Sequence, residues 1–155
     1  MNRILAIALL GVLFVITMPR VSAQQAPEGK GGATLRIKVS GAKSAKGTIR
    51  AALFQSANGF PTDPTQAIQR QAADIDPQTL SAQITFAGLP AGTYAVSVFH
   101  DENMNQKIDK NLMGIPKEGY GASNNPKKKR RAPTFDEAKF SLKSTDQTIE
   151  IRLIY

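Results

Sequence analysis

The sequence predicts an all-β fold, an antiparallel Greek-key β-sandwich with one short helix. At least six short segments have the residue pattern of strands, turn residues separate them, and almost no stretch has the periodicity of a helix. Leu, Pro, Gly and Tyr within residues 89–94 also follow the order of a tyrosine corner, which favours a sandwich over a small barrel. An ordinary turn with a half-buried Tyr94 is the alternative for so short a motif.

Two strands are expected at the start of the domain. Leu35, Ile37 and Val39 alternate with polar residues, which predicts a strand with one buried face. Residues 41–47 begin and end with glycine and are expected to form a hairpin loop, so that residues 48–55 return as the neighbouring strand.

The strand pattern then lapses and resumes. No strand is expected in residues 56–77, where Asp63 before Pro64 is typical of a helix N-terminus and predicts the one short helix. Four further strands are expected, with residues 87–92 as the turn between the first two. These strands are residues 80–86, 93–99, 140–142 and 148–155.

The N-terminal residues are typical of a secretory signal peptide. Arg3 supplies a positive charge, residues 4–18 are apolar, and small residues lead up to Ala23, after which cleavage is expected. The alternative is an uncleaved membrane anchor, but the apolar run is shorter than the roughly 20 residues of a spanning helix. No transmembrane segment is expected after cleavage. The protein is therefore predicted to be periplasmic or secreted. The expected organisation is a signal peptide at 1–23, a disordered leader at 24–32 and a single β-sandwich domain at 33–155.

The amino-acid composition limits which kinds of site and partner the protein can have. The chain has no cysteine, which excludes disulfides and thiolate metal sites, and its formal net charge is +8. Much of the positive excess lies in one run of five cations, for which a solvated loop is the simplest interpretation. Because exported proteins rarely meet nucleic acid, the alternative partner of this run is an anionic lipid or lipopolysaccharide surface. The five residues are Lys127, Lys128, Lys129, Arg130 and Arg131.

An oxygen-rich segment follows the expected strand at residues 93–99. Its carboxylate and amide side chains fall at positions one, three, five and nine of a twelve-residue loop, and a backbone carbonyl is available at position seven. Oxygen ligands at alternate positions can converge on a Ca²⁺ ion. The sequence therefore predicts a Ca²⁺ site. Its expected ligands are Asp101, Asn103, Asn105, the carbonyl of Lys107, and Asp109.

The loop departs from an EF-hand at two positions. Gln106 stands where the turn has glycine, and Leu112 stands where the bidentate glutamate belongs. Glu118 is the candidate for the missing carboxylate, with Glu102 as an alternative, and the two neutral asparagines predict weak affinity. A solvated turn is the alternative interpretation of the same composition.

Other candidate binding residues flank the loop. His100 is the only histidine; a hydrolase in which Asp101 orients it is the enzymatic alternative, but no activated-serine motif is present. A structural hydrogen bond that holds the loop is the commoner role for a histidine in this position. Tyr120, Ser123 and Asn124 belong to a glycine-rich segment that suits sugar or peptide recognition, or else a loop packed on its own aromatic ring.

Several of these segments together resemble one bacterial family. They are Gly-Thr-Tyr-Ala-Val at 92–96, His-Asp-Glu-Asn at 100–103 with Asn105 and Asp109, residues 114–121, Ser-Asn-Asn at 123–125, and Phe135 with residues 137–140. On these motifs the chain, from about residue 35 to residue 155, is similar to the family catalogued as domain of unknown function 2141. The resemblance implies an exported domain of Gram-negative bacteria with a transthyretin-like or immunoglobulin-like sandwich and no established activity.

The expected function is therefore that of an exported, non-enzymatic β-sandwich. Its loop region would be stabilised by Ca²⁺ and would form a ligand or partner surface. An envelope component, a glycan and an anionic lipid all remain open as partners.

Overall fold

The computed structural model describes residues 32–127 and 131–155 and consists of strands in two sheets with little helix. The strands are β1 (Ala33–Ser40), β2 (Thr48–Phe54), β3 (Gln69–Asp74), β4 (Ala82–Leu89), β5 (Gly92–Asp101), β6 (Tyr120–Ala122), β7 (Phe140–Leu142) and β8 (Gln147–Arg152). The helices are a 3₁₀ turn at Pro64–Gln66 and α1 at Phe135–Ala138.

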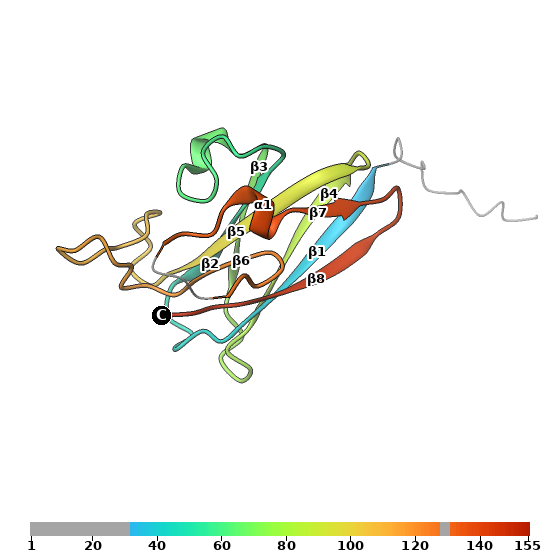
Figure 1. Cartoon of the computed structure of the whole chain (residues 1–155). Coiled ribbons are helices and arrows are strands. Elements are labelled where there is room, and N and C mark those ends of the chain that lie inside the picture. The colour runs from blue at the N-terminus through green and yellow to red at the C-terminus, as the bar shows by residue number, and fades with distance from the viewer. Residues whose placement is uncertain (1–31, 128–130) are drawn as a thin grey trace, which may run out of the picture.

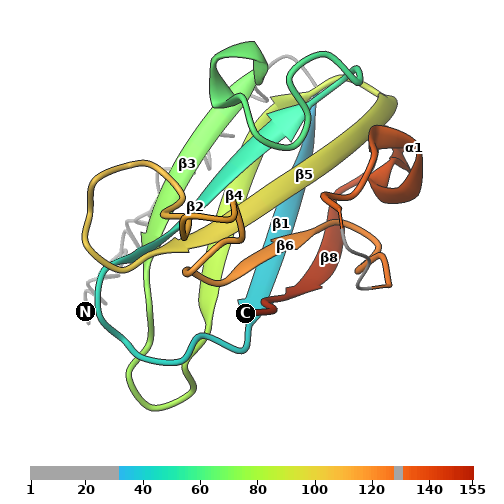
Figure 2. The ribbon, with the colours of Figure 1, turned by 60° about the vertical axis from the view of Figure 1, so that its left-hand side comes forward.

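The two sheets form the layers of a sandwich, as predicted. One sheet has the strand order β4-β1-β8, and the other has the order β3-β2-β5-β6, with β7 paired to the early part of β5. Figure 1 shows the two layers, and in Figure 2 β5 crosses in front of β1. The all-β prediction is confirmed.

The core lies between the sheets. Period-two alternation turns one face of each central strand inward, and the apolar side chains on these faces form one continuous buried cluster. Its fully buried members include Leu35, Ile37, Leu53, Phe86 and Tyr94. A smaller cluster of Ala95, Ala122 and Ala138, packed against Phe60 and Phe135, lies where α1 contacts β5.

The tyrosine corner is present. Tyr94 is fully buried, and its hydroxyl donates a hydrogen bond of 2.8 Å to the carbonyl of Pro90. Because β4 and β5 belong to different sheets, the bond closes the arch between the two layers. The expected short helix is also present, as a 3₁₀ turn with Asp63 at its N-cap.

The predicted hairpin at residues 41–47 is wrong. β1 pairs with β4 and β8, whereas β2 pairs with β3 and β5, so these residues cross from one sheet to the other. Glycine-flanked turns and period-two strands are common to hairpins and to connections between sheets, so the local pattern does not separate them. The buried Ala42, whose amide bonds to the carbonyl of Leu80, ties the crossing to the body of the sandwich.

Two further features differ from expectation. β8 runs parallel to β1, although the predicted sheets were antiparallel throughout. A parallel pair needs a long connection, and nearly the whole described chain lies between these two strands. The second feature is the presence of two strands that were not expected, β3 and the three-residue β6. β3 is an edge strand in the segment expected to lack one, and its mostly exposed residues carry no apolar alternation.

The predictions for the N-terminus concern a part of the chain outside the described residues. The signal peptide at 1–23 and all but the last residue of the leader at 24–32 fall there, as do Lys128, Lys129 and Arg130 of the basic run. Within residues 32–127 and 131–155, no helix is long and apolar enough to cross a membrane.

Candidate binding loop

The longest projection from the described sandwich is the segment between β5 and β6. We call residues 102–118 the 102–118 loop; Figure 1 shows it extending beyond the ends of the strands. It begins where β5 ends at Asp101 and returns to the sheet just before Tyr120. The predicted metal ligands other than Asp101 all lie within it.

Asp101 anchors the start of this loop from inside the protein. Its side chain is 0% exposed, and Oδ2 accepts hydrogen bonds from Nε of Arg50 at 2.5 Å and from the backbone amide of Gln106 at 3.0 Å. Arg50 lies on β2, the strand beside β5. An ion pair with the neighbouring strand therefore fixes the direction in which the loop leaves the sheet.

Glu118 joins the two arms of the loop. The residue is buried, and its two carboxylate oxygens each accept a backbone N–H at 2.9 Å, Oε1 from Glu102 and Oε2 from Asp109. Two hydrogen bonds to a charged acceptor are stronger than neutral ones. Glu118 thus closes the loop, and position 118 is brought close to the predicted metal ligands.

The polar side chains in the first half of the loop converge on Asp109. Its Oδ2 accepts a hydrogen bond from Nδ2 of Asn103 at 2.8 Å, and its Oδ1 accepts one from Nδ2 of Asn105 at 3.0 Å. The Oδ1 atoms of both asparagines accept backbone amides two residues on, as Asx turns do. Three of the predicted ligands therefore lie within hydrogen-bonding distance of one another.

Gln106 takes the backbone conformation that glycine usually provides. Its φ is +66°, in the left-handed region, and its amide bonds to Asp101. This is position six of the predicted Ca²⁺ loop, where a sharp turn is needed. The residue type departs from the EF-hand pattern, but the turn is made.

A metal ion here would need more than carboxylates. Among the residues that the structure describes, no three His, Asp or Glu side chains are grouped so that they could hold a metal ion. Amide and carbonyl oxygens would have to complete the set. Oδ1 of Asp101 is available: it and Oγ1 of Thr48 are the two buried side-chain polar atoms in the described chain that have no hydrogen-bond partner. Such an atom normally has a protein, water or ion partner.

His100 is buried beneath the base of the loop. Nε2 bonds to the carbonyl of Lys46 at 2.7 Å, and Nδ1 lies 2.8 Å from the hydroxyl of Tyr155, which accepts a bond from the amide of Lys43. A carbonyl only accepts, so Nε2 carries a proton and Nδ1 of a neutral ring accepts from the tyrosine. The ring is 0% exposed and both its nitrogens are engaged.

Tyr155 is held at the same place by close packing. A Cβ atom on Gly119 would lie 2.4 Å from its ring, so the contact needs glycine. Burial is the main cause that raises the pKa of its hydroxyl above the ordinary value, and the nearby charges of Glu102 and Glu118 act in the same direction. The last residue of the chain thus closes the base of the loop.

The far end of the loop is a small hairpin that sequence reasoning did not single out. We call residues 110–117 the tip hairpin. Lys110 pairs with Pro116, the amide of Asn111 bonds to the carbonyl of Ile115 at 2.8 Å, and Gly114 has φ +76°. The signal was present in the sequence as an apolar Leu-Met pair between lysines.

The remaining predicted binding residues lie away from this tip. Oγ of the buried Ser123 donates to the carbonyl of Ala138 at 2.6 Å and accepts the amide of Val96, while Nδ2 of Asn124 donates to the carbonyl of Lys139 at 2.8 Å. These two side chains hold the segment around α1 against β5.

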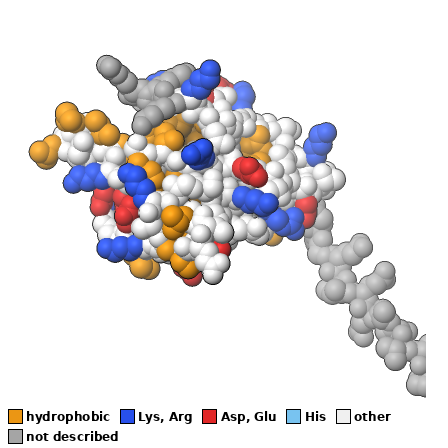
Figure 3. Space-filling model, turned by 90° about the horizontal axis from the view of Figure 1, so that it is seen from below, with side chains coloured by type: hydrophobic (Ala, Val, Ile, Leu, Met, Phe, Trp, Pro, Cys, Tyr) orange, Lys and Arg blue, Asp and Glu red, His pale blue; other side chains and the backbone are white. Residues whose placement is uncertain are grey.

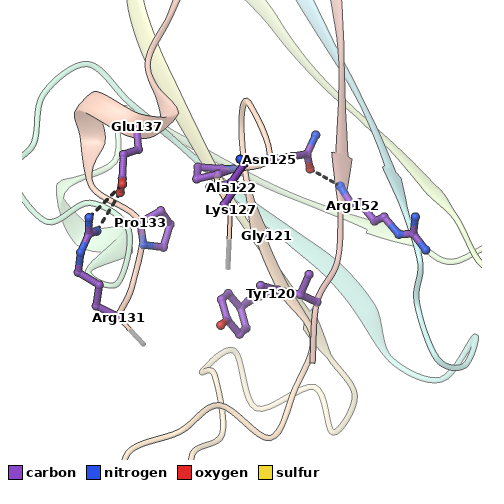
Figure 4. Close-up of a pocket in the computed structure, with 11 residues that line it drawn as sticks. Tyr120, Gly121, Ala122, Asn125, Lys127, Arg131, Pro133, Glu137 and Arg152 are labelled. Atoms are coloured by element: carbon purple, nitrogen blue, oxygen red, sulfur yellow. Dashed lines mark hydrogen bonds and ion pairs between the residues drawn. The ribbon is translucent and has the colours of Figure 1, made fainter. Parts of the chain in front are cut away.

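Tyr120 lines a shallow pocket of about 160 Å³ beside the described ends of the basic run. Lys127, Arg131 and Arg152 also line it, but Figure 4 shows Arg131 paired with Glu137 and Arg152 running away from Tyr120. The guanidinium of Arg131 lies 2.8 Å from the carboxylate of Glu137, so its charge is compensated.

The family of the chain follows from a comparison with family sequence profiles. The profile described as an uncharacterized protein conserved in bacteria, DUF2141, matches residues 37–150. The chain belongs to this family. No curated protein and no solved structure matches it.

The part that matches DUF2141 contains the site described above. It includes Arg50 and Asp101, the whole 102–118 loop with Glu118, and both sheets except residues 33–36 of β1 and 151–152 of β8. Tyr155 lies beyond its end. The family description assigns no activity, so the function has to be argued from the geometry of the loop.

Proposed function

We propose that this DUF2141 protein is an exported, non-enzymatic β-sandwich domain that uses the 102–118 loop as its binding surface and binds Ca²⁺ there. The observation that carries the proposal is the pair of buried carboxylates, Asp101 and Glu118, at the base of the loop. Burying an ionised group costs several kcal/mol unless it is paired and hydrogen-bonded. Asp101 is paired with Arg50, and Glu118 accepts two backbone amides, so the two carboxylates hold the loop in one conformation that can serve as a binding surface.

The surroundings of His100 support a non-enzymatic role. A general base needs a free nitrogen that can reach a substrate, directly or through a water. Both ring nitrogens are engaged with the protein, and the ring has no exposed surface. Asp101 does not orient the ring; its Oδ2 is paired with Arg50 instead.

The grouping of the predicted ligand residues supports the Ca²⁺ part of the proposal. Asn103 and Asn105 both donate Nδ2 to Asp109, position six already turns, and Oδ1 of Asp101 has no hydrogen-bond partner within the described residues. Ca²⁺ takes six to eight oxygen ligands in flexible geometries. Two asparagines in place of carboxylates lower the charge of the set, so the affinity is expected to be weak.

Calorimetric titration after chelator treatment tests the metal site. Ca²⁺ should bind with a dissociation constant up to about the millimolar range of extracellular modules. Asp109→Asn should abolish the binding heat, because it removes the carboxylate on which the asparagines converge. Asp74→Asn, which removes an exposed carboxylate at the end of β3, should leave it unchanged. No heat with the unchanged protein, together with a melting temperature indifferent to Ca²⁺, would refute the metal site.

Export rests on the small-residue pattern that ends at Ala23. Expression of the full chain in a Gram-negative host should place the protein in the periplasm or medium, with Gln24 as the first residue by mass spectrometry. An unprocessed chain that stays in the cytoplasm would refute export.

A further inference from the structure

The tip hairpin combines tight backbone geometry with an apolar surface. Oδ1 of Asn111 accepts the amides of Met113 at 2.9 Å and of Ile115 at 3.0 Å, and the amide of Gly114 bonds back to the carbonyl of Asn111. These bonds close the turn without help from Leu112 or Met113, whose side chains are therefore free to face outward.

The apolar side chains at and near this turn are exposed. Leu112 and Met113 have relative exposures of 108% and 79%, and Ile115 and Met104 are also exposed. Turns of this kind are usually built from Gly, Pro, Asn, Asp and Ser. Figure 3 shows hydrophobic side chains gathered at the end of this projection. Nothing in the folding of the loop accounts for an exposed apolar pair at its outermost point.

Positive charge surrounds the apolar tip. Lys110 and Lys117 bracket it, and Lys107 lies on the adjoining turn; all three are exposed, and none forms an ion pair within the described part of the chain. Residues 110–117 contain no acidic residue. The two carboxylates nearest to the hairpin in sequence, Asp109 and Glu118, both accept hydrogen bonds inside the loop.

We propose that the tip hairpin inserts its apolar side chains into the interface of an anionic phospholipid bilayer while its lysines contact the lipid phosphates. The inference rests on the proposed function in taking the 102–118 loop as the binding surface, and it names the partner. Apolar side chains flanked by lysine are what binds at the boundary between headgroups and acyl chains, at a depth of about 5–10 Å. The lysines supply the charge complementarity that selects an anionic surface.

The shape of the tip favours lipid over a protein partner. The tip hairpin is a narrow convex projection with three exposed apolar side chains, whereas a stable protein interface covers about 800 Å² on each partner. A bilayer needs no matching concave surface, because lipid packs around whatever enters it. The free energy comes from apolar burial and phosphate contacts at the tip alone.

Tryptophan fluorescence tests insertion directly, because the chain has no tryptophan of its own. Met113→Trp would place a reporter at the tip, and Ile68→Trp would place one at another exposed apolar position outside the loop. With vesicles of phosphatidylglycerol and phosphatidylethanolamine, the emission of Met113→Trp should shift to the blue, whereas that of Ile68→Trp should not. Vesicles of phosphatidylcholine should cause a far smaller shift. All variants are compared as the same processed, exported chain.

Two charge variants of Met113→Trp identify the cations responsible. Replacing Lys107, Lys110 and Lys117 with Gln should weaken binding to the anionic vesicles by at least tenfold, since each surface cation is worth about fivefold. The matched control, in which Lys38, Arg70 and Lys143 become Gln, loses the same charge elsewhere and should bind as before. Equal melting temperatures establish that the variants are folded.

Three results would overturn the inference. The emission of Met113→Trp could be unchanged by every vesicle, which leaves a protein as the occupant of the tip. The two charge variants could weaken binding equally, or binding could depend only on residues 127–130, tested by their replacement with Ser. Ca²⁺ binding without a fluorescence shift of Met113→Trp would refute membrane insertion and support the metal site. A fluorescence shift without Ca²⁺ binding would support membrane insertion and refute the metal site.

Discussion

Asp101 shows what the sequence can predict about a single residue. Its place at position one of an oxygen-rich loop was visible, and the structure puts it beside the predicted turn at Gln106. Its ion pair with Arg50 was not predictable, because the partner lies 51 residues away on another strand. Local spacing defines a loop, but the contacts that anchor the loop depend on which strands are neighbours.

Breaking this ion pair should destabilise the whole domain. Asp101→Asn leaves Arg50 without its counter-charge and should lower the free energy of unfolding by about 2–3 kcal/mol, since Arg50 keeps some contact with solvent. Asp74→Asn should change it by less than about 0.5 kcal/mol. Urea unfolding measures both; a result for Asp101→Asn as small as that for the control would contradict the anchoring role.

Tyr155 should make stability depend on pH in alkaline solution. Its pKa in the folded protein is raised above the ordinary value of 10.0, mainly by burial. The unfolded chain therefore loses this proton first, so the contribution is complete below pH 10.0 and is lost as the pH rises through the raised pKa. The free energy of unfolding, measured at neutral pH and above pH 10, should fall less between the two conditions for Tyr155→Phe than for the unchanged protein.

At neutral pH the same variant should cost about 1–2 kcal/mol, because His100 and the amide of Lys43 lose their partner. If the free energy of unfolding falls equally in the two proteins above pH 10, other groups cause the pH dependence.

At the scale of elements, strand existence was easier to predict than strand pairing. Alternation in β1, β4 and β5 follows from one buried face, which any sandwich requires. β3 was missed because both its faces are largely exposed. The connection at residues 41–47 was predicted wrongly because a hairpin loop and a connection between two sheets are built from the same kinds of residue. The two differ only in which distant strands the flanking strands pair with.

The arch between β4 and β5 was predictable because it carries a specific hydrogen bond. Tyr94→Phe keeps the buried ring and removes the bond to Pro90, so it should lower the free energy of unfolding by about 1–1.5 kcal/mol. Tyr120→Phe is the matched control, because the hydroxyl of Tyr120 has no hydrogen bond within the described residues. Denaturant unfolding gives the free energy of unfolding of each variant. Equal values for the two variants would mean that the hydrogen bond of the tyrosine corner contributes nothing.

In the molecule as a whole, the residues of the candidate site lie at one end of the sandwich. His100, Asp101 and Glu118 are buried there, the C-terminal Tyr155 closes the same end, and the 102–118 loop projects from it. The sequence identified this region through its ligand spacing and its single histidine. It could not identify the tip hairpin as a surface, because exposure of Leu112 and Met113 is a property of the folded loop.

The central claim is that Asp101 and Glu118 hold the 102–118 loop in one conformation for binding. Amide hydrogen exchange tests it most directly, since the amides of Glu102, Gln106 and Asp109 bond to these carboxylates. They should exchange as slowly as strand amides of β5. Glu118→Gln should speed exchange at Glu102 or Asp109 by at least about tenfold with the sandwich intact, and Glu150→Gln should not. Exchange at solvent-exposed rates in the unchanged protein would contradict the claim.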